Sequence, residues 1–141
     1  MPDLDQSNDF FLKHIDLVQS IVARMASNSF LIRGWSVTIL SGIFALASKT
    51  DAHSLLPIAF VPLIAFWLLD GFYLSQERRF RKLYSAVLSK DTSIPSLSLD
   101  ASSACGDRMM WPKALVSRTV ATFHGVLTLS LVLVMIYFRH H

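Results

Sequence analysis

Histidine is the residue type in this sequence best suited to chemistry, because it binds metals and exchanges protons near neutral pH. The chain has five histidines: His14, His53, His124, His140 and His141. No two stand four residues apart, and no cluster of carboxylates accompanies them. A zinc site needs several such ligands at short spacing, so no metal ligand is predicted.

Other catalytic patterns are also missing from the sequence. Serine, histidine and aspartate are present, but without a nucleophile-elbow motif, a phosphate-binding glycine loop or a dinucleotide-binding motif. We therefore predict a non-enzymatic protein with no catalytic residue and no cofactor. His124 lies in an apolar segment, where packing against a neighbouring helix or a polar contact is favoured over a proton relay.

The charges Arg33 and Asp70 stand out because each lies near one end of an otherwise apolar segment. Arg33 precedes Asp51, in the connection between the segments, by eighteen residues, and Asp70 follows it by nineteen. Antiparallel helices, rising about 1.5 Å per residue, place both charges about 27–29 Å from that connection. A structural ion pair between the helices is the preferred interpretation. Independent snorkelling to the membrane surface and a functional charge are the alternatives.

The segments that position these charges predict a membrane protein. Hydrophobic residues make up 52% of the 141 residues and charged ones 16%, whereas soluble domains carry about 25% charged residues. The segments 30–48, 54–74 and 119–138 meet the roughly 20 residues that a helix needs to cross a bilayer, if the first two each carry one charge near an interface. Too little polar sequence remains to coat three such helices in water. An all-α polytopic membrane protein with three transmembrane helices is therefore predicted.

The distribution of positive charge predicts the orientation. Of 13 Lys and Arg residues, three precede or enter the first segment and eight lie between the second and third. One lies in the 49–53 connection and one follows the third segment. Because cytoplasmic loops are enriched in Lys and Arg, the N-terminus and the second loop are expected in the cytoplasm and the C-terminus outside.

A basic cluster directly after the second segment consists of Arg78, Arg79, Arg81 and Lys82. Each basic residue near anionic headgroups contributes about 1 kcal/mol to membrane binding. The cluster is predicted to fix the topology and to hold an interfacial helix against anionic lipids of the bilayer. A specific site for a lipid or another anion is the alternative.

Amphipathic helices are predicted on the cytoplasmic side. Apolar residues at intervals of four and three are typical of a helix that seats against another helix or lies on a membrane surface. Between residues 9 and 29 this stripe consists of Phe11, Ile15, Val18, Val22 and Met25. The run Ser27-Asn28-Ser29 is expected to bend or cap this helix before the first span. A second apolar helix face is predicted in 75–88.

Four parts of the chain follow from these patterns: a cytoplasmic amphipathic N-terminal helix (1–29), a transmembrane hairpin (30–75), a cytoplasmic basic helix with a linker (76–118), and the third transmembrane helix with a short tail (119–141). Pro57 and Pro62 are expected to kink the first half of the second span. The Ser-rich stretch 89–107 is expected to be an irregular linker.

Several short stretches resemble a group of small bacterial membrane proteins without an assigned activity. They are RMASNSF at 24–30, GW at 34–35 and LDGFYLSQERRFRKLY at 69–84, and the likeness covers residues 10–88. The resemblance implies a bacterial inner-membrane location. The general plan, with an N-terminal helix, a transmembrane hairpin and a post-hairpin helix, is also similar to the membrane effectors of bacterial antiphage nucleotide-signalling systems. That likeness implies no catalytic residues.

Three functions are expected, in order of preference. The first is a non-enzymatic inner-membrane protein that self-associates as a homo-oligomer and perturbs the membrane. It is based on the small soluble portion, the helical stripes available for oligomerisation and the likeness in general plan, and Gly34, Ser41 and Gly42 add a weak signal for close helix approach. The second is an accessory or scaffold subunit that recruits a cytoplasmic protein partner. The third is a small transporter subunit. No nucleic-acid partner is expected, because the chain has no long basic tract and no nucleic-acid-binding motif.

Overall fold

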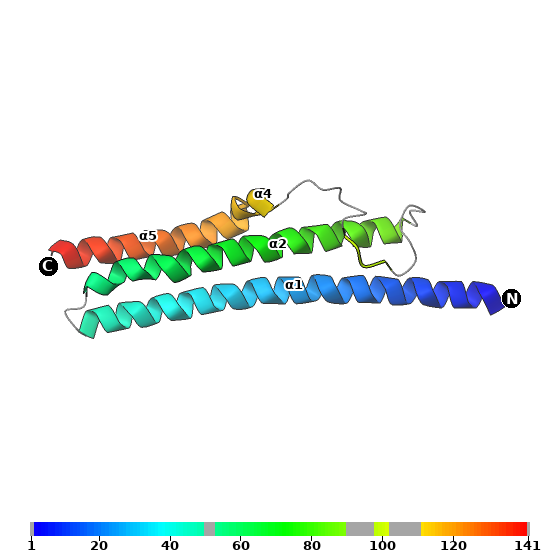
Figure 1. Ribbon diagram of the computed structural model, residues 1–141, viewed down its shortest axis with the longest axis horizontal. Helices are drawn as coiled ribbons and strands as arrows, with labels where there is room; N and C mark the ends of the chain where they lie inside the picture. The colour runs from blue at the N-terminus through cyan, green and yellow to red at the C-terminus, as the bar shows by residue number, and fades with distance from the viewer. Residues whose placement is uncertain (1, 50–52, 90–97, 102–110, 141) are drawn as a thin grey trace. The chain divides into compact units, whose positions relative to one another are not determined.

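The computed structural model describes residues 2–49, 53–89, 98–101 and 111–140 of the protein. Its elements are listed in chain order: α1 (Pro2–Lys49), the 3-10 helix η1 (His53–Ala59), α2 (Phe60–Leu88), α4 (Trp111–Leu115) and α5 (Arg118–His140) (Figure 1). The described residues contain no β-strand, which confirms the all-α prediction. Most of the predicted linker 89–107 lies outside the described residues, as do residues 50–52 of the predicted turn.

Three of the helices are long and apolar enough to cross a membrane: Asn8–Lys49, Leu56–Leu88 and Arg118–His140. Only 17%, 28% and 17% of their most apolar stretches are buried inside the protein. The remaining apolar surface is too extensive for a water-facing monomer and suits the hydrocarbon core of a bilayer. The three helices contain the first and third predicted spans and nearly all of the second, and the third span is matched closely by α5.

Helix α1 differs from the prediction because the run Ser27-Asn28-Ser29 does not interrupt it. Serine and asparagine reduce helix stability by only a few tenths of a kcal/mol each, which apolar neighbours on both sides offset. Pro2 occupies the first position, where a missing N–H costs nothing. Lys49 stands in the last turn, where a cation interacts favourably with the helix dipole. The predicted boundary between a cytoplasmic helix and the first span is therefore not a break in the backbone.

Helix α2 also corrects the prediction, at both ends. The stretch that contains Pro57 forms η1, and Pro62 falls in the first turn of α2. The first four N–H groups of a helix have no partner within it, so Pro62 removes no hydrogen bond there. Neither proline therefore lies in the interior of α2, and the kink predicted for the first half of the second span stays a prediction. The helix then continues past residue 74 to Leu88, so the predicted helix 75–88 is the second half of α2 and not a separate element.

The chain divides into two compact units, Met1–Asn28 with Tyr73–Met110, and Ser29–Phe72 with Trp111–His141. The first unit has a core of Val18, Leu83 and Val87, joined by Ala101 and flanked by Phe11. The predicted N-terminal stripe therefore seats against α2 through part of its length. His14, buried in this unit, places its Nε2 atom 2.8 Å from the carbonyl oxygen of Ser98.

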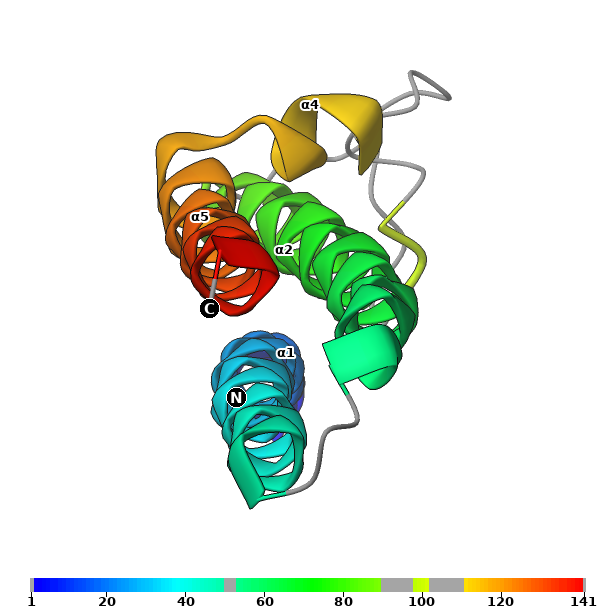
Figure 2. The same cartoon turned by 90° about the vertical axis from the view of Figure 1, so that its left-hand side faces the viewer.

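The second unit gathers the apolar parts of three long helices. Its core consists of Leu40 from α1, Ala59 from η1, Leu63 from α2 and Leu131 from α5. Within this unit, α1, α2 and α5 lie beside one another in both views (Figures 1 and 2). Each of these helices buries one face in this core. The opposite faces are apolar and exposed, as expected for helices surrounded by lipid.

Candidate functional site

The second unit encloses a carboxylate, Asp70 of α2, whose side chain is completely buried. It accepts hydrogen bonds from the Ser29 hydroxyl and from Arg33, both on α1. A third side chain, His124 of α5, lies against the same carboxylate. An ionised carboxylate has room for about four hydrogen bonds, so these neighbours replace the water that the bilayer excludes.

Arg33 forms an ion pair with Asp70. Its Nε lies 2.9 Å from Asp70 Oδ2, and its Nη2 donates to Oδ1 at 3.3 Å. The Arg33 side chain is 24% exposed, and its guanidinium lies 5.7 Å from the centre of the Phe123 ring, within reach of a cation–π contact. The structure thus brings together the two charges that the sequence placed at equal depth, and the ion pair links α1 to α2.

His124 adds the third helix to this site. Its Nε2 lies 3.3 Å from Asp70 Oδ2. Because a carboxylate only accepts hydrogen bonds, we assign the ring proton to Nε2. The ring stacks on Trp67 with 6.2 Å between ring centres and meets the edge of Phe123. Its other nitrogen, Nδ1, is buried and has no hydrogen-bond partner among the described residues.

Ser29 is the member of the site that the sequence prediction missed, because it stands in a polar run that was expected to end a helix. In an uninterrupted helix, Ser29 and Arg33 are four residues apart and share one face. That spacing would have placed Ser29 beside Asp70 once the break was dismissed. His124, the one histidine in the third span, was expected to make a packing or polar contact, and it makes both.

The three side chains Ser29, Asp70 and His124 are not arranged as a hydrolytic triad. In a hydrolytic triad, histidine stands between the serine and the carboxylate so that it can take the serine proton. Here the Ser29 hydroxyl donates directly to Asp70, and His124 approaches the carboxylate separately. Among the described residues, no group of three or more His, Cys, Asp and Glu side chains is placed to hold a metal ion.

A short helix closes one side of the site. Trp67 of α2 donates from Nε1 to the carbonyl oxygen of Leu115 at 3.2 Å, and Trp111 of α4 reaches the Leu68 carbonyl at 3.5 Å. Gly71 makes this close approach possible, because a Cβ atom there would lie 2.4 Å from Leu115 Cδ2. Residue 71, next to Asp70, is therefore a glycine because a larger side chain would collide with Leu115.

The basic cluster belongs to the other unit. Arg81 and Lys82 are exposed, whereas Arg78 and Arg79 are partly buried. Arg81 pairs with Glu77, one helical turn earlier, at 2.7 Å. The positive charge of Arg81 is thus partly neutralised within α2. Binding of anionic lipid by the cluster stays a prediction.

Comparison with known proteins leaves the geometry as the basis for any functional conclusion. No protein-family model matches this chain, and no curated protein or solved structure matches it either.

Proposed function

We propose that this protein is a non-enzymatic protein of the bacterial inner membrane that self-associates through its helices and perturbs the bilayer once assembled. The observation that carries the proposal is a line of small residues on α1. Gly34, Thr38 and Gly42 follow one another at intervals of four, and all three are exposed. Small residues at this spacing let two membrane helices approach closely.

This line lies opposite the face that α1 uses within its own unit. Ser36, Leu40 and Ala47 are buried at 3%, 5% and 1% exposure. By contrast, a Cβ atom added to Gly34 or Gly42 would meet nothing within 4 Å. The Thr38 hydroxyl donates to the Gly34 carbonyl oxygen at 3.0 Å, so the line carries no unsatisfied hydroxyl. It is a shallow, apolar strip that a second helix fits.

The test of self-association compares glycines on two helices. Energy transfer between labelled chains in liposomes gives the dimer affinity. Gly34→Leu with Gly42→Leu should weaken association by about tenfold or more, roughly 1.4 kcal/mol, because the added side chains hold the helices apart. Gly125→Leu on α5 is the matched control, since Gly125 is also exposed with nothing within 4 Å of an added Cβ. Equal effects of the α1 and α5 substitutions on association, or no effect of either, would contradict the proposal.

Membrane perturbation requires a separate readout. Liposomes loaded with a fluorescent dye should leak when the wild-type chain is incorporated, and less when it carries Gly34→Leu with Gly42→Leu. The Gly125→Leu chain should leak like the wild type. A chain that associates but releases no dye would contradict the membrane-perturbing part of the proposal.

A second candidate function, recruitment of a cytoplasmic protein partner, is favoured by the first unit. Phe10, Leu12 and Leu17 of α1 are 47%, 59% and 45% exposed, beyond the stripe that packs on α2. Leu12→Gln with Leu17→Gln should then abolish capture of the partner by the tagged full chain. These substitutions are sharper than deletion of the helix, which would remove Val18 from the core. Unchanged capture would exclude this surface.

A further inference from the structure

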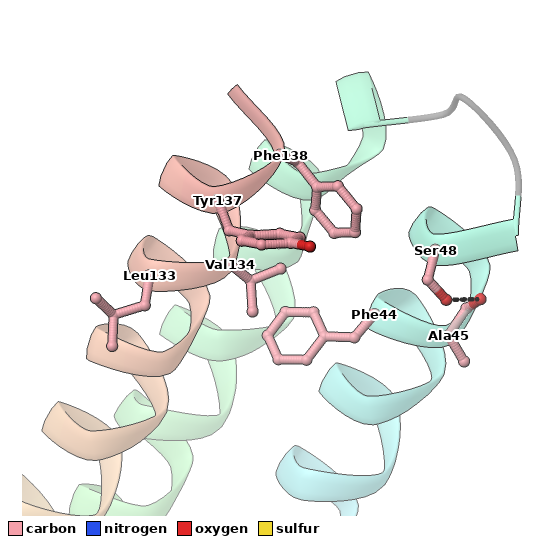
Figure 3. Close-up of a pocket in the computed structure, with 7 residues that line it drawn as sticks. All are labelled: Phe44, Ala45, Ser48, Leu133, Val134, Tyr137 and Phe138. Atoms are coloured by element: carbon pink, nitrogen blue, oxygen red, sulfur yellow. Dashed lines mark hydrogen bonds between the residues drawn. The ribbon is translucent and has the colours of Figure 1, made fainter. Parts of the chain in front are cut away.

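An open apolar groove of about 520 Å³ lies between the C-terminal parts of α1 and α5 in the second unit. Phe44 of α1 and Val134, Tyr137 and Phe138 of α5 line it. Figure 3 shows the Phe44 side chain reaching from α1 toward the Tyr137 ring on α5. Ser48, also at the groove, donates its hydroxyl to the Ala45 carbonyl oxygen of its own helix at 3.0 Å. The surface of the groove is therefore mainly apolar.

The groove opens on a surface that faces hydrocarbon. Leu133, at its edge, and Ile136 are 57% and 49% exposed on a helix able to span a membrane. An unfilled apolar gap forfeits dispersion contacts with its walls. In a bilayer the molecule at hand to fill such a gap is an acyl chain.

A basic residue follows the groove residues along each of the two helices. Lys49 follows Ser48 at the end of α1, and Arg139 follows Phe138 in the last turn of α5. Both side chains are exposed, and neither forms an ion pair within the described part of the chain. The C-terminal ends of the helices carry partial negative charge, so attraction for an anion comes from these side chains. A phosphate at the membrane boundary would meet both.

We propose that this groove binds one anionic phospholipid, with an acyl chain along Phe44 and Tyr137 and the phosphate at Lys49 and Arg139. The site is distinct from the basic cluster at 78–82, which belongs to the other unit. The residues that line the groove do not include Gly34, Thr38 or Gly42, although Ala45 follows Gly42 by three residues.

The first experiment measures selectivity for the headgroup. The full chain in detergent is titrated with phosphatidylglycerol, and then with phosphatidylcholine carrying the same acyl chains, and native mass spectrometry counts the bound lipid. We expect one saturable phosphatidylglycerol per chain, and at least about tenfold weaker binding of phosphatidylcholine, which carries no net charge. Equal affinities for the two lipids would overturn the proposal, as would binding without saturation.

Charge substitutions test the phosphate contact. Lys49→Gln and Arg139→Gln should each weaken phosphatidylglycerol binding by about fivefold, the contribution expected of one basic residue at an anionic surface. Lys113→Gln, on α4 of the same unit and also exposed, is the control and should leave binding unchanged. Equal loss in the control would mean that general charge, and not this site, holds the lipid.

Filling the groove tests the acyl-chain contact. Val134→Trp should reduce lipid binding to the level of phosphatidylcholine, with Val134→Phe as a milder variant where the larger side chain disturbs folding. Val132→Trp, on the exposed face of the same helix, should bind lipid like the wild type. Unchanged binding by a folded Val134 variant would overturn the proposal. Disulfide crosslinking between Tyr137→Cys residues of two chains would assign the groove to a second copy instead.

Discussion

At the scale of single residues, the site depends on keeping Asp70 ionised in an apolar surrounding. A lone charge costs about 2.5–3.5 kcal/mol at the bilayer centre on insertion scales, and less near an interface, where the sequence places Asp70. Three side chains offset that cost here, with Arg33 supplying the opposite charge and Ser29 and His124 supplying hydrogen bonds. Hydrogen bonds and an ion pair to Asp70 therefore hold the three long helices together in this unit, in addition to the packing of apolar side chains.

Removing one partner of this ion pair should destabilise the protein more than removing both. We expect Asp70→Asn or Arg33→Met alone to lower the free energy of unfolding by about 3–5 kcal/mol, because each leaves an uncompensated polar group buried. The double variant should recover part of that loss, with a coupling of about 0.5–3 kcal/mol. Reversible unfolding in mixed micelles measures all three.

The control for that cycle is an exposed pair on α1. Lys13 and Asp9 are 2.7 Å apart, with 62% and 60% of their side chains exposed. Asp9→Asn should therefore change stability by at most about 1 kcal/mol. Equal costs for Asp9→Asn and Asp70→Asn, or additive costs in the cycle, would show that the buried pair has no special role.

At the scale of elements, the sequence predicted the helices better than it predicted their ends. Apolar length identified the spans, and counting from Asp51 paired Arg33 with Asp70, because both depend on regular helical rise. The polar run 27–29 was misjudged, since its effect on the helix depends on tertiary partners. The acceptor of the Ser29 hydroxyl lies forty-one residues away, so the role of Ser29 follows from its four-residue spacing to Arg33 only once helix α1 is known to be continuous.

The packing of α1 on α2 in the first unit yields a second prediction. Leu83 is completely buried in a core with Val18 and Val87. Leu83→Ala should cost about 2–5 kcal/mol, as expected when a buried leucine leaves a cavity. Leu88→Ala, on the same helix but 48% exposed, should cost far less. Limited proteolysis in denaturant compares them, and similar midpoints for the two variants would contradict the described core.

At the scale of the whole molecule, the three apolar helices and the uneven charge distribution both indicate insertion into a membrane. The exposed apolar faces need hydrocarbon. We infer an orientation with the N-terminus and the loop before α5 in the cytoplasm and the C-terminus outside, because eleven of 13 Lys and Arg residues, the three and the eight counted above, lie on that side. Self-association and lipid binding both presuppose this insertion.

The most direct test of that claim uses Cys105, the single cysteine of the sequence. In spheroplasts, a membrane-impermeant maleimide should leave Cys105 unlabelled until the membrane is permeabilised, because the inferred orientation places the loop before α5 in the cytoplasm. With Cys105→Ser and His141→Cys, the same reagent should label the chain in intact spheroplasts. Labelling after denaturation serves as the control for thiol reactivity. Labelling of both positions from the same side would contradict an odd number of membrane crossings between them, and with it the three-span account.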